Sequence, residues 1–403
     1  MDSYRFFITF YTAFGLLIIF DIYFNIQLSN YLFKKTNSKA LKKIVRILSI
    51  LMFIAFILCF GPGIQNFFND DFIKILRMIT SIWYLPKLVI VPVMLIARFT
   101  KYIFQKFSKK TVLQTDTGRR SFAIDLCWAA AVVPFYSVAK GAYLTTTDFK
   151  IFEVDVPLTH LPGNLHGLKI VQISDIHAGS FYSSKPMFEA RLIVNSLKPD
   201  IIMITGDFVN HSPDELLLII DELKQLRAEY GIYACLGNHD HYMTKEHQQD
   251  LIEQVNGTGI ELLINQNKTL TIKGKNLQIA GTDNSSFGRY YADFPKTFKG
   301  LSSDLPTILM CHDPINWDKS IVGKIPAGLT LAGHTHGGQI GMDFWGSYIT
   351  PARYLYKQWQ GIYRNKNQYL YVNRGLGTIG PPIRVSQPPE ITLITLITPS
   401  NLT

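Results

Sequence analysis

Four long apolar stretches in the first 145 residues restrict the fold of this chain more than any other feature. They cover residues 6–28, 44–64, 78–97 and 122–143. Each approaches the ~20 residues that an α-helix needs to cross a bilayer. Because lysine-rich links separate them, buried helices of a soluble domain are the weaker interpretation. The sequence predicts an all-α transmembrane region of four helices at residues 1–145 and a separate domain at residues 146–403.

Positive charge is concentrated in the predicted membrane region. Residues 1–145 hold 18 Lys and Arg against 6 Asp and Glu, whereas the rest of the chain holds 22 against 24. The basic side chains gather in the first and third links, at residues 34–43 and 98–120. Positive loops stay in the cytoplasm. We therefore predict a multi-pass protein of the bacterial cytoplasmic membrane, with residues 146–403 on the periplasmic or extracellular side.

Three ionisable residues lie within the apolar stretches: Asp21, Lys87 and Asp125. A charge in lipid is costly, so such residues usually pair or face a cavity. We expect a structural pair between a lysine and an aspartate. A role in relaying a signal through the helices is the alternative.

After residue 143, short strand-like runs alternate with helical ones, which is typical of an α/β domain. Strands are expected at residues 168–173, 201–205, 232–236, 277–280, 307–310, 329–332, 370–372 and 391–397. Helical periodicity is found at residues 187–197 and 214–230. The runs 269–272 and 277–280 flank a short turn and predict a hairpin, so the sheet would be mixed.

Polar residues directly follow five of these predicted strands. The segments are Asp175-Ile176-His177, Gly206-Asp207, Gly237-Asn238-His239-Asp240, His312-Asp313 and Gly333-His334-Thr335-His336. The carboxyl edge of an open α/β sheet is where such proteins place their sites. Two divalent cations roughly 3.5–4 Å apart need a bridging carboxylate and further imidazole or oxygen ligands. The pattern predicts a dinuclear metal site, and mixed His, Asp and Asn ligation favours Mn, Fe or Zn.

In this order the five segments resemble the motifs of the calcineurin-like metallophosphoesterases. Likeness to a membrane-associated or exported bacterial branch comes from His334–Gln339, Asn373-Arg374-Gly375 and Pro388-Pro389-Glu390-Ile391. The resemblance covers residues 150–399 approximately. It implies a sandwich of mixed β-sheets flanked by helices.

The resemblance also implies a role for each motif residue. One metal would be held by Asp175, His177 and His336, the second by Asn238, His312 and His334, and Asp207 would bridge them. His239 would lie over the phosphoryl group and protonate the leaving oxygen, with Asp175 or Asp240 tuning its pKa. Asn238 and His239 would thus also contact the substrate.

The chain departs from the family pattern after the bridging aspartate. Many members carry an arginine a few residues later, but here Phe208-Val209-Asn210-His211 follow. A phosphate-binding arginine would then be Arg374 or Arg384.

These expectations describe a membrane-anchored hydrolase in which a metal-bridging hydroxide attacks a phosphodiester, phosphomonoester or pyrophosphate. The anchor would hold the site near the bilayer, so a lipid-linked substrate and contact with membrane lipids are expected. The alternatives are a phospho-ligand sensor that signals through the helices and a nuclease-type phosphodiesterase. The negative balance of residues 146–403 argues against a nucleic-acid partner. The sequence does not define the oligomeric state.

Overall fold

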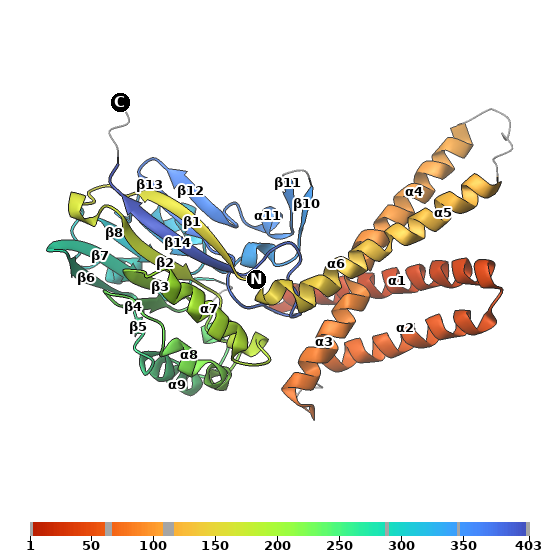
Figure 1. The fold of residues 1–403 in the computed structure, drawn as a ribbon, viewed down its shortest axis with the longest axis horizontal. Helices are drawn as coiled ribbons and strands as arrows, with labels where there is room; N and C mark the ends of the chain where they lie inside the picture. Colours follow the sequence, from red (N-terminus) through yellow and green to blue (C-terminus); the bar gives the residue numbers. More distant parts are fainter. Residues whose placement is uncertain (1–2, 61–66, 108–116, 287–289, 345–346, 400–403) are drawn as a thin grey trace. The chain divides into compact units, whose positions relative to one another are not determined.

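The computed structural model describes residues 3–60, 67–107, 117–286, 290–344 and 347–399. The chain divides into two compact units (Figure 1). The first consists mainly of Met1–Ala142 and is helical, and the second begins at Tyr143.

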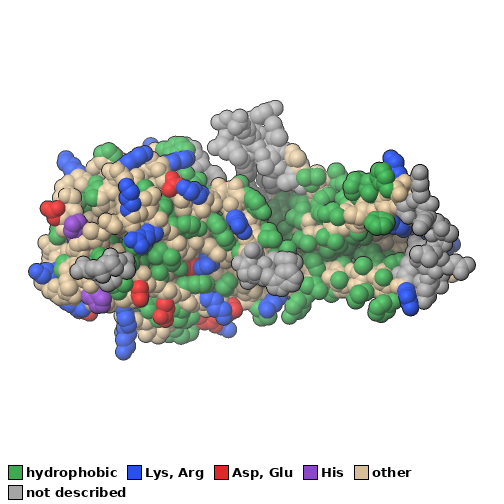
Figure 2. Space-filling model, turned by 90° about the horizontal axis from the view of Figure 1, so that it is seen from above, with side chains coloured by type: hydrophobic (Ala, Val, Ile, Leu, Met, Phe, Trp, Pro, Cys, Tyr) green, Lys and Arg blue, Asp and Glu red, His purple; other side chains and the backbone are tan. Residues whose placement is uncertain are grey.

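Six helices form the described part of the first unit. They are α1 (Ser3–Thr36), α2 (Lys39–Phe60), α3 (Asp70–Tyr84), α4 (Lys87–Phe107), α5 (Thr117–Ala130) and α6 (Val132–Tyr143). Four segments are long and apolar enough to cross a membrane: Gly15–Thr36, Lys39–Phe60, Asp71–Phe107 and Ser121–Thr147. Hydrophobic side chains cover much of the visible surface of this unit, at the right of Figure 2. An all-α region with four apolar spans is therefore confirmed.

The bounds of the spans differ from those predicted. The third joins α3 to α4 across Leu85 and Pro86 and extends beyond residues 78–97 on both sides. Pro86 has no amide hydrogen to donate, which interrupts the helical hydrogen bonding there. The fourth is likewise divided, between α5 and α6. The second predicted stretch ends at residue 64, but α2 ends at Phe60 and residues 61–64 lie outside the described part.

Two pairs of opposite charge join the helices of the first unit. Buried Asp21 of α1 accepts hydrogen bonds from Lys87 of α4, from Trp83 Nε1 at 2.8 Å and from Ser49 Oγ at 2.6 Å. Lys35 of α1 pairs with Asp125 of α5 at 2.5 Å. The expected structural pairing of the intramembrane charges is confirmed.

Two six-stranded sheets form the second unit, in the orders β1-β14-β2-β3-β4-β5 and β12-β13-β9-β8-β7-β6. The strands of the first sheet are β1 (Lys150–Pro157), β14 (Glu390–Ile397), β2 (Leu168–Ile173), β3 (Ile201–Thr205), β4 (Ile232–Cys235) and β5 (Glu261–Leu262). Those of the second are β12 (Gly361–Asn365), β13 (Gln368–Val372), β9 (Leu329–Ala332), β8 (Thr307–Met310), β7 (Lys275–Gly281) and β6 (Gln266–Ile272).

Each sheet combines parallel and antiparallel strands. In the first, β2 to β5 are parallel, β14 runs antiparallel to β2, and β1 runs parallel to β14. In the second, β13, β9, β8 and β7 are parallel, and β12 and β6 are antiparallel edge strands. The predicted hairpin is the β6–β7 pair, and the predicted sandwich of mixed sheets is confirmed.

Apolar side chains from both sheets form a common core between them. Ile170 and Met203 of the first sheet belong to the same buried cluster as Ile279 and Leu329 of the second. The outer face of the first sheet packs against α7 (Lys185–Ser196), α8 (Ile220–Leu223) and α9 (Lys245–Asn256). Burial on both faces explains why the central strands are continuous apolar runs.

The helix predicted at residues 214–230 is wrong. This segment contains the 3₁₀ turns η5 (Pro213–Leu218) and the single turn α8. Ile219 between them has φ −124° and ψ 1°, which is not helical. The Glu215 carboxylate accepts the backbone N–H groups of Asn210 and His211, so it anchors the loop after β3. Helix α9 and strand β1 were not predicted from the sequence.

Candidate metal centre

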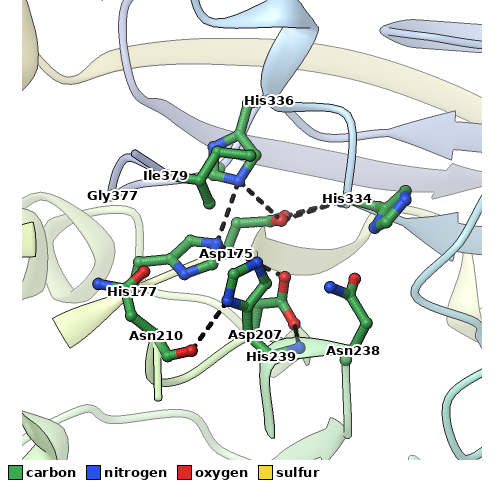
Figure 3. A network of polar contacts seen from close by, with 12 residues as sticks. Asp175, His177, Asp207, Asn210, Asn238, His239, His334, His336, Gly377 and Ile379 are labelled. Carbon is green, nitrogen blue, oxygen red and sulfur yellow. Dashed lines mark hydrogen bonds and ion pairs between the residues drawn. The ribbon is translucent and has the colours of Figure 1, made fainter. Parts of the chain in front are cut away.

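Five strand ends bring the predicted ligands to one edge of the sandwich. The side chains are Asp175 and His177 after β2, Asp207 after β3, Asn238 and His239 after β4, His312 after β8, and His334 and His336 after β9. Their ligand atoms form three groups within 4.8 Å: Asp175, His177 and His336; His177, Asp207 and His239; and Asp207, His312 and His334. Figure 3 shows Asn238 beside Asp207.

Asp207 lies between two sets of imidazoles. Its Oδ2 is 3.2 Å from His312 Nε2 and 3.5 Å from His177 Nε2. On one side, His177 Nε2 is 3.1 Å from His336 Nε2, which is 3.3 Å from Asp175 Oδ1. On the other side, His334 Nδ1 is 3.3 Å from His312 Nε2. A carboxylate in this position can bridge two ions.

Five of these residues have left-handed backbone conformations. The φ angles are 47° at Asp175, 45° at His177, 57° at Asp207, 72° at His334 and 52° at His336. Such conformations cost on the order of 1–3 kcal/mol each and persist only where the surroundings enforce them. Hydrogen bonds between neighbouring loops supply that constraint, for example from Asp175 N to Gly206 O at 2.9 Å.

Glycine leaves space for the carboxylates at two strand ends. A Cβ on Gly237 would lie 2.1 Å from Asp207 Oδ1, and one on Gly333 would lie 2.1 Å from Asp175 Oδ2. Neither glycine has a positive φ, so it is the close approach of the carboxylate that requires glycine there.

The histidines differ in charge. Burial lowers the pKa of His177 to about 3 and that of His334 to about 4, and holds the pKa of His336 well below its usual range. These imidazoles are therefore neutral at neutral pH, which is the state that binds metals. Burial also lowers the pKa of His312, but the Asp207 carboxylate beside it outweighs this effect and raises the pKa to about 10.

The Asp207–His312 pair has the charges of an ion pair. Burial opposes ionisation of Asp207, yet His312 and His239 hold its pKa well below the ordinary value. The proton on His312 Nε2 lies between this nitrogen and the carboxylate. A cation bound between the same two atoms would take the place of that proton.

Two buried polar atoms of the site have no hydrogen-bond partner among the described residues, Asn238 Oδ1 and His177 Nδ1. Tyr242 Oη accepts from Asn238 Nδ2 at 3.0 Å and fixes the orientation of the amide. A buried unsatisfied acceptor costs ~1–3 kcal/mol, and a cation would remove this penalty for Asn238 Oδ1. Neutral imidazoles, two carboxylates and this amide oxygen together fit divalent transition metals.

His239 is half-buried, unlike the other members of the site. Its Nδ1 is 2.9 Å from the carbonyl oxygen of Asn210 (Figure 3). A carbonyl can only accept, so Nδ1 carries a hydrogen, and Nε2 is the ring nitrogen left to act on a substrate. This ring contact of His239 is with Asn210, and its tuning by Asp175 or Asp240 stays a prediction.

Asp240 instead organises the loops that carry the ligands. Its carboxylate accepts backbone N–H groups from Asp207 at 2.9 Å, Phe208 at 2.8 Å and Gly237 at 2.9 Å. Burial and the charge of Asp207 raise the pKa of Asp240 to about 7. The loops after β3 and β4 are therefore held together by one side chain.

Tyr356 and Asn210 contact histidines of the site, and neither residue belongs to the motifs recognised in the sequence. The hydroxyl of Tyr356 is 3.1 Å from His334 Nε2, so it fixes the ring whose Nδ1 faces His312. Asn210 occupies the stretch where the family pattern has an arginine. The missing arginine after Asp207 was the one signal in the sequence that could have indicated a role for Asn210.

Protein acceptors surround both arginines proposed for phosphate binding. Arg374 pairs with buried Glu390 and donates to Gln360 Oε1 at 2.9 Å. Arg384 is fully buried and donates to the carbonyl oxygens of Arg374 at 2.9 Å and Gly375 at 3.1 Å. They support the loop after β13, and their contact with phosphate stays a prediction.

Comparisons with known proteins identify the family of this chain. The calcineurin-like phosphoesterase family matches residues 168–338, and the family described as probable calcineurin-like phosphoesterase, transmembrane domain, matches residues 4–145. The metallophosphoesterase YkuE of Bacillus subtilis is 34% identical over 260 residues, which are 63% of this chain and 87% of that protein.

Two other relatives extend the comparison. The metallophosphoesterase Cj0846 of Campylobacter jejuni is 29% identical over 397 residues, which are 95% of this chain and 97% of that protein. The phosphodiesterase YaeI of Escherichia coli is 27% identical over 244 residues, which are 60% of this chain and 86% of that protein. The resemblance and the enzyme class predicted from the sequence are confirmed. The chain is a membrane-associated hydrolase of phosphoester bonds and belongs to the calcineurin-like metallophosphoesterase family.

Proposed function

We propose that this chain is a dinuclear-metal phosphoesterase that acts on a lipid-linked phosphodiester, phosphomonoester or pyrophosphate. Residues 1–145 would anchor it in the bacterial cytoplasmic membrane, and residues 146–403 would form the catalytic domain on the outer side. The observation that carries the proposal is the position of Asp207 between His177 and His312.

The distances around Asp207 support the two ligand sets that the resemblance implies. Asp175, His177 and His336 would hold one ion, and Asn238, His312 and His334 would hold the other, as Mn, Fe or Zn. When bound, such ions supply positive charge for the phosphoryl oxygens and a water acidic enough to give hydroxide at neutral pH.

His239 is the residue best placed to move a proton. The Asn210 carbonyl fixes its Nδ1, so the Nε2 atom can face the substrate. A protonated Nε2 would give its proton to the leaving oxygen, a step that general acids accelerate by ~10²–10⁴-fold. The Asp207 carboxylate accepts the His239 backbone N–H at 2.8 Å and so positions the ring relative to the ligands.

The thiols near the site are unsuited to nucleophilic attack. Burial raises the pKa of Cys311 to about 12 and that of Cys235 well above its usual value. Both remain protonated at neutral pH, and a thiol is a poor nucleophile compared with a thiolate. We therefore expect hydrolysis without a covalent intermediate.

The membrane anchor supports a lipid-linked substrate. The last apolar span ends at Thr147 and β1 begins at Lys150. Two residues extend to roughly 7 Å, which confines the catalytic domain to the neighbourhood of the bilayer.

Hydrolysis by the purified full-length chain in detergent tests the proposal. The panel would hold a phosphodiester, a phosphomonoester, a pyrophosphate and a lipid-linked form of each, with and without a chelator. We expect turnover of at least one compound, lost with chelator and restored by Mn, Fe or Zn. Binding of phosphorylated compounds without any turnover would instead favour a sensor and contradict the enzyme.

A further inference from the structure

An exposed apolar surface lies on the insertion that follows the last ligand. The insertion contains β10 (Met342–Phe344), β11 (Ser347–Ile349) and α11 (Ala352–Leu355). Tyr354 and Leu355 are 80% and 75% exposed, and Met342 and Ile349 are also exposed. We call these four residues, with exposed Arg353 and Lys357, the rim. Apolar side chains exposed together in this way mark a binding surface.

The rim is connected directly to the metal centre. Tyr356, next to Leu355, contacts His334 Nε2 at 3.1 Å. The carbonyl oxygen of Trp359 accepts from Thr335 Oγ1, between His334 and His336, at 2.6 Å. A molecule bound at the rim would therefore be adjacent to the ligands.

The membrane tether reaches the catalytic unit at the same edge as the site. Lys150, at the start of β1, lies opposite Glu390, at the start of β14, in the register of these two parallel strands. Because β14 is antiparallel to β2, this end of β14 lies beside the carboxyl end of β2, where Asp175 follows. Glu390 N also donates to the carbonyl oxygen of Gly375, whose Cβ would meet Asp175. The chain therefore enters the catalytic unit at the edge that carries the metal centre.

The chemistry of the rim fits the interfacial layer of a membrane. Tyrosine is enriched at the level of the lipid headgroups, and aliphatic side chains insert below it. The guanidinium of Arg353 would contact anionic headgroups, whereas the ammonium of Lys357 pairs with Asp318 at 2.8 Å. The combination of exposed apolar side chains and Arg353 at the edge where the tether enters favours the bilayer as the partner.

We propose that the rim rests in the headgroup layer of the bilayer and receives the apolar tail of a lipid phosphoester, whose phosphoryl group then reaches the metal centre. This inference rests on the proposed function for the reaction, but contact with the bilayer can be measured without it.

Fluorescence quenching tests the contact in the full-length chain, reconstituted in phosphatidylcholine and phosphatidylglycerol vesicles. In a Cys127→Ser background, which removes the exposed thiol, Leu355→Cys is labelled with an environment-sensitive dye. Leu217→Cys, at another exposed apolar residue, is the matched control. Headgroup-level nitroxide lipids should quench the label at residue 355 and leave that at 217 unaffected. No quenching at 355, or equal quenching at both, would overturn the contact, and a blue-shifted but unquenched label would assign the rim to a protein partner.

Kinetics test the role of the rim in binding the tail. The probes are bis(p-nitrophenyl) phosphate, which is water-soluble, and hexadecyl p-nitrophenyl phosphate in the same vesicles, which shares the leaving group. Tyr354→Ser with Leu355→Ser should raise KM for the hexadecyl probe by roughly tenfold, the loss expected from removing exposed apolar area from lipid contact. KM for the soluble probe should not change. Leu217→Ser with Leu218→Ser, also exposed, should change neither.

The two proposals fail in different ways. Equal KM values for the wild type and the rim variant with the hexadecyl probe would overturn the role of the rim, while turnover of the soluble probe would leave the phosphoesterase intact. Absence of turnover with both probes would contradict the proposed function, and the quenching result would still decide whether the rim meets the membrane.

Discussion

At the scale of single residues, Asp207 links the parts of the site. Its Oδ2 faces His312 and His177, and its Oδ1 accepts the backbone N–H of His239. The backbone N–H of Asp207 donates to the Asp240 carboxylate. If the proposed function holds, a change at Asp207 should therefore affect both ions and His239 at once.

Replacement of Asp207 by asparagine should reduce hydrolysis more than any other single ligand change. Changes to residues that only orient metal ligands cost about 10–100-fold, so loss of the bridging carboxylate should exceed about 100-fold. Metal content and turnover of the purified variant are the measurements, with Asp214→Asn, an exposed carboxylate, as control. A variant that kept both ions and full activity would show that Asp207 does not bridge them.

His239→Ala should retain metal and lose turnover by roughly 10²–10⁴-fold, because a general acid is removed and no assigned ligand is lost. The loss should be largest for substrates with poor leaving groups, which depend most on protonation. Comparison of aryl and alkyl phosphodiesters measures this dependence. If the variant lost its ions, the role of His239 would be ligation, since its ring nitrogen also lies within the group formed with His177 and Asp207.

The sequence predicted the candidate ligands because they directly follow apolar strands. The partners of these ligands could not be predicted in the same way. Tyr356 is 22 residues from His334 and contacts it only after the chain folds back through β10, β11 and α11. Asp240 directly follows His239 in the sequence, but its carboxylate accepts backbone N–H groups of the loop after β3. Such contacts depend on left-handed loop conformations that residue type does not reveal.

At the scale of elements, the loops after the strands pack so closely that they fix the positions of the carboxylates. Gly237→Ala would place a Cβ 2.1 Å from Asp207 Oδ1 and force the carboxylate out of position. We expect loss of metal and destabilisation by about 1–3 kcal/mol, the usual cost of overpacking. Thermal unfolding and elemental analysis are the measurements. Gly163→Ala, where a Cβ has nothing within 4 Å, should behave as the wild type, and equal effects of both changes would refute the steric argument.

Apolar runs predicted the elements well where both faces are buried. The central strands are such runs, and β3, β8 and β9 match their predicted bounds. Periodicity failed at residues 214–230, because Leu216, Ile219 and Leu223 are buried at helical spacing although the backbone breaks at Ile219. Edge strand β1 was not predicted, although its residues alternate between exposed and less exposed from Ile151 to Val156.

At the scale of the whole molecule, the alternating charge of the links predicts which side of the membrane holds the site. The seven basic residues of link three should oppose its translocation. A reporter that is active only outside the cytoplasm, fused after Thr403, should therefore be active, and one that works only in the cytoplasm should be silent. The reverse pattern would place residues 146–403 in the cytoplasm and leave the chemistry of the strand ends unchanged.

The metal content of the purified wild-type chain tests the central claim most directly. Elemental analysis should find close to two divalent transition-metal ions per chain, as two ligand sets sharing Asp207 require. Removal of both ions by a chelator should abolish phosphodiester hydrolysis, and their return should restore it. A chain without bound metal, whose hydrolysis is unaffected by chelator, would contradict the dinuclear site.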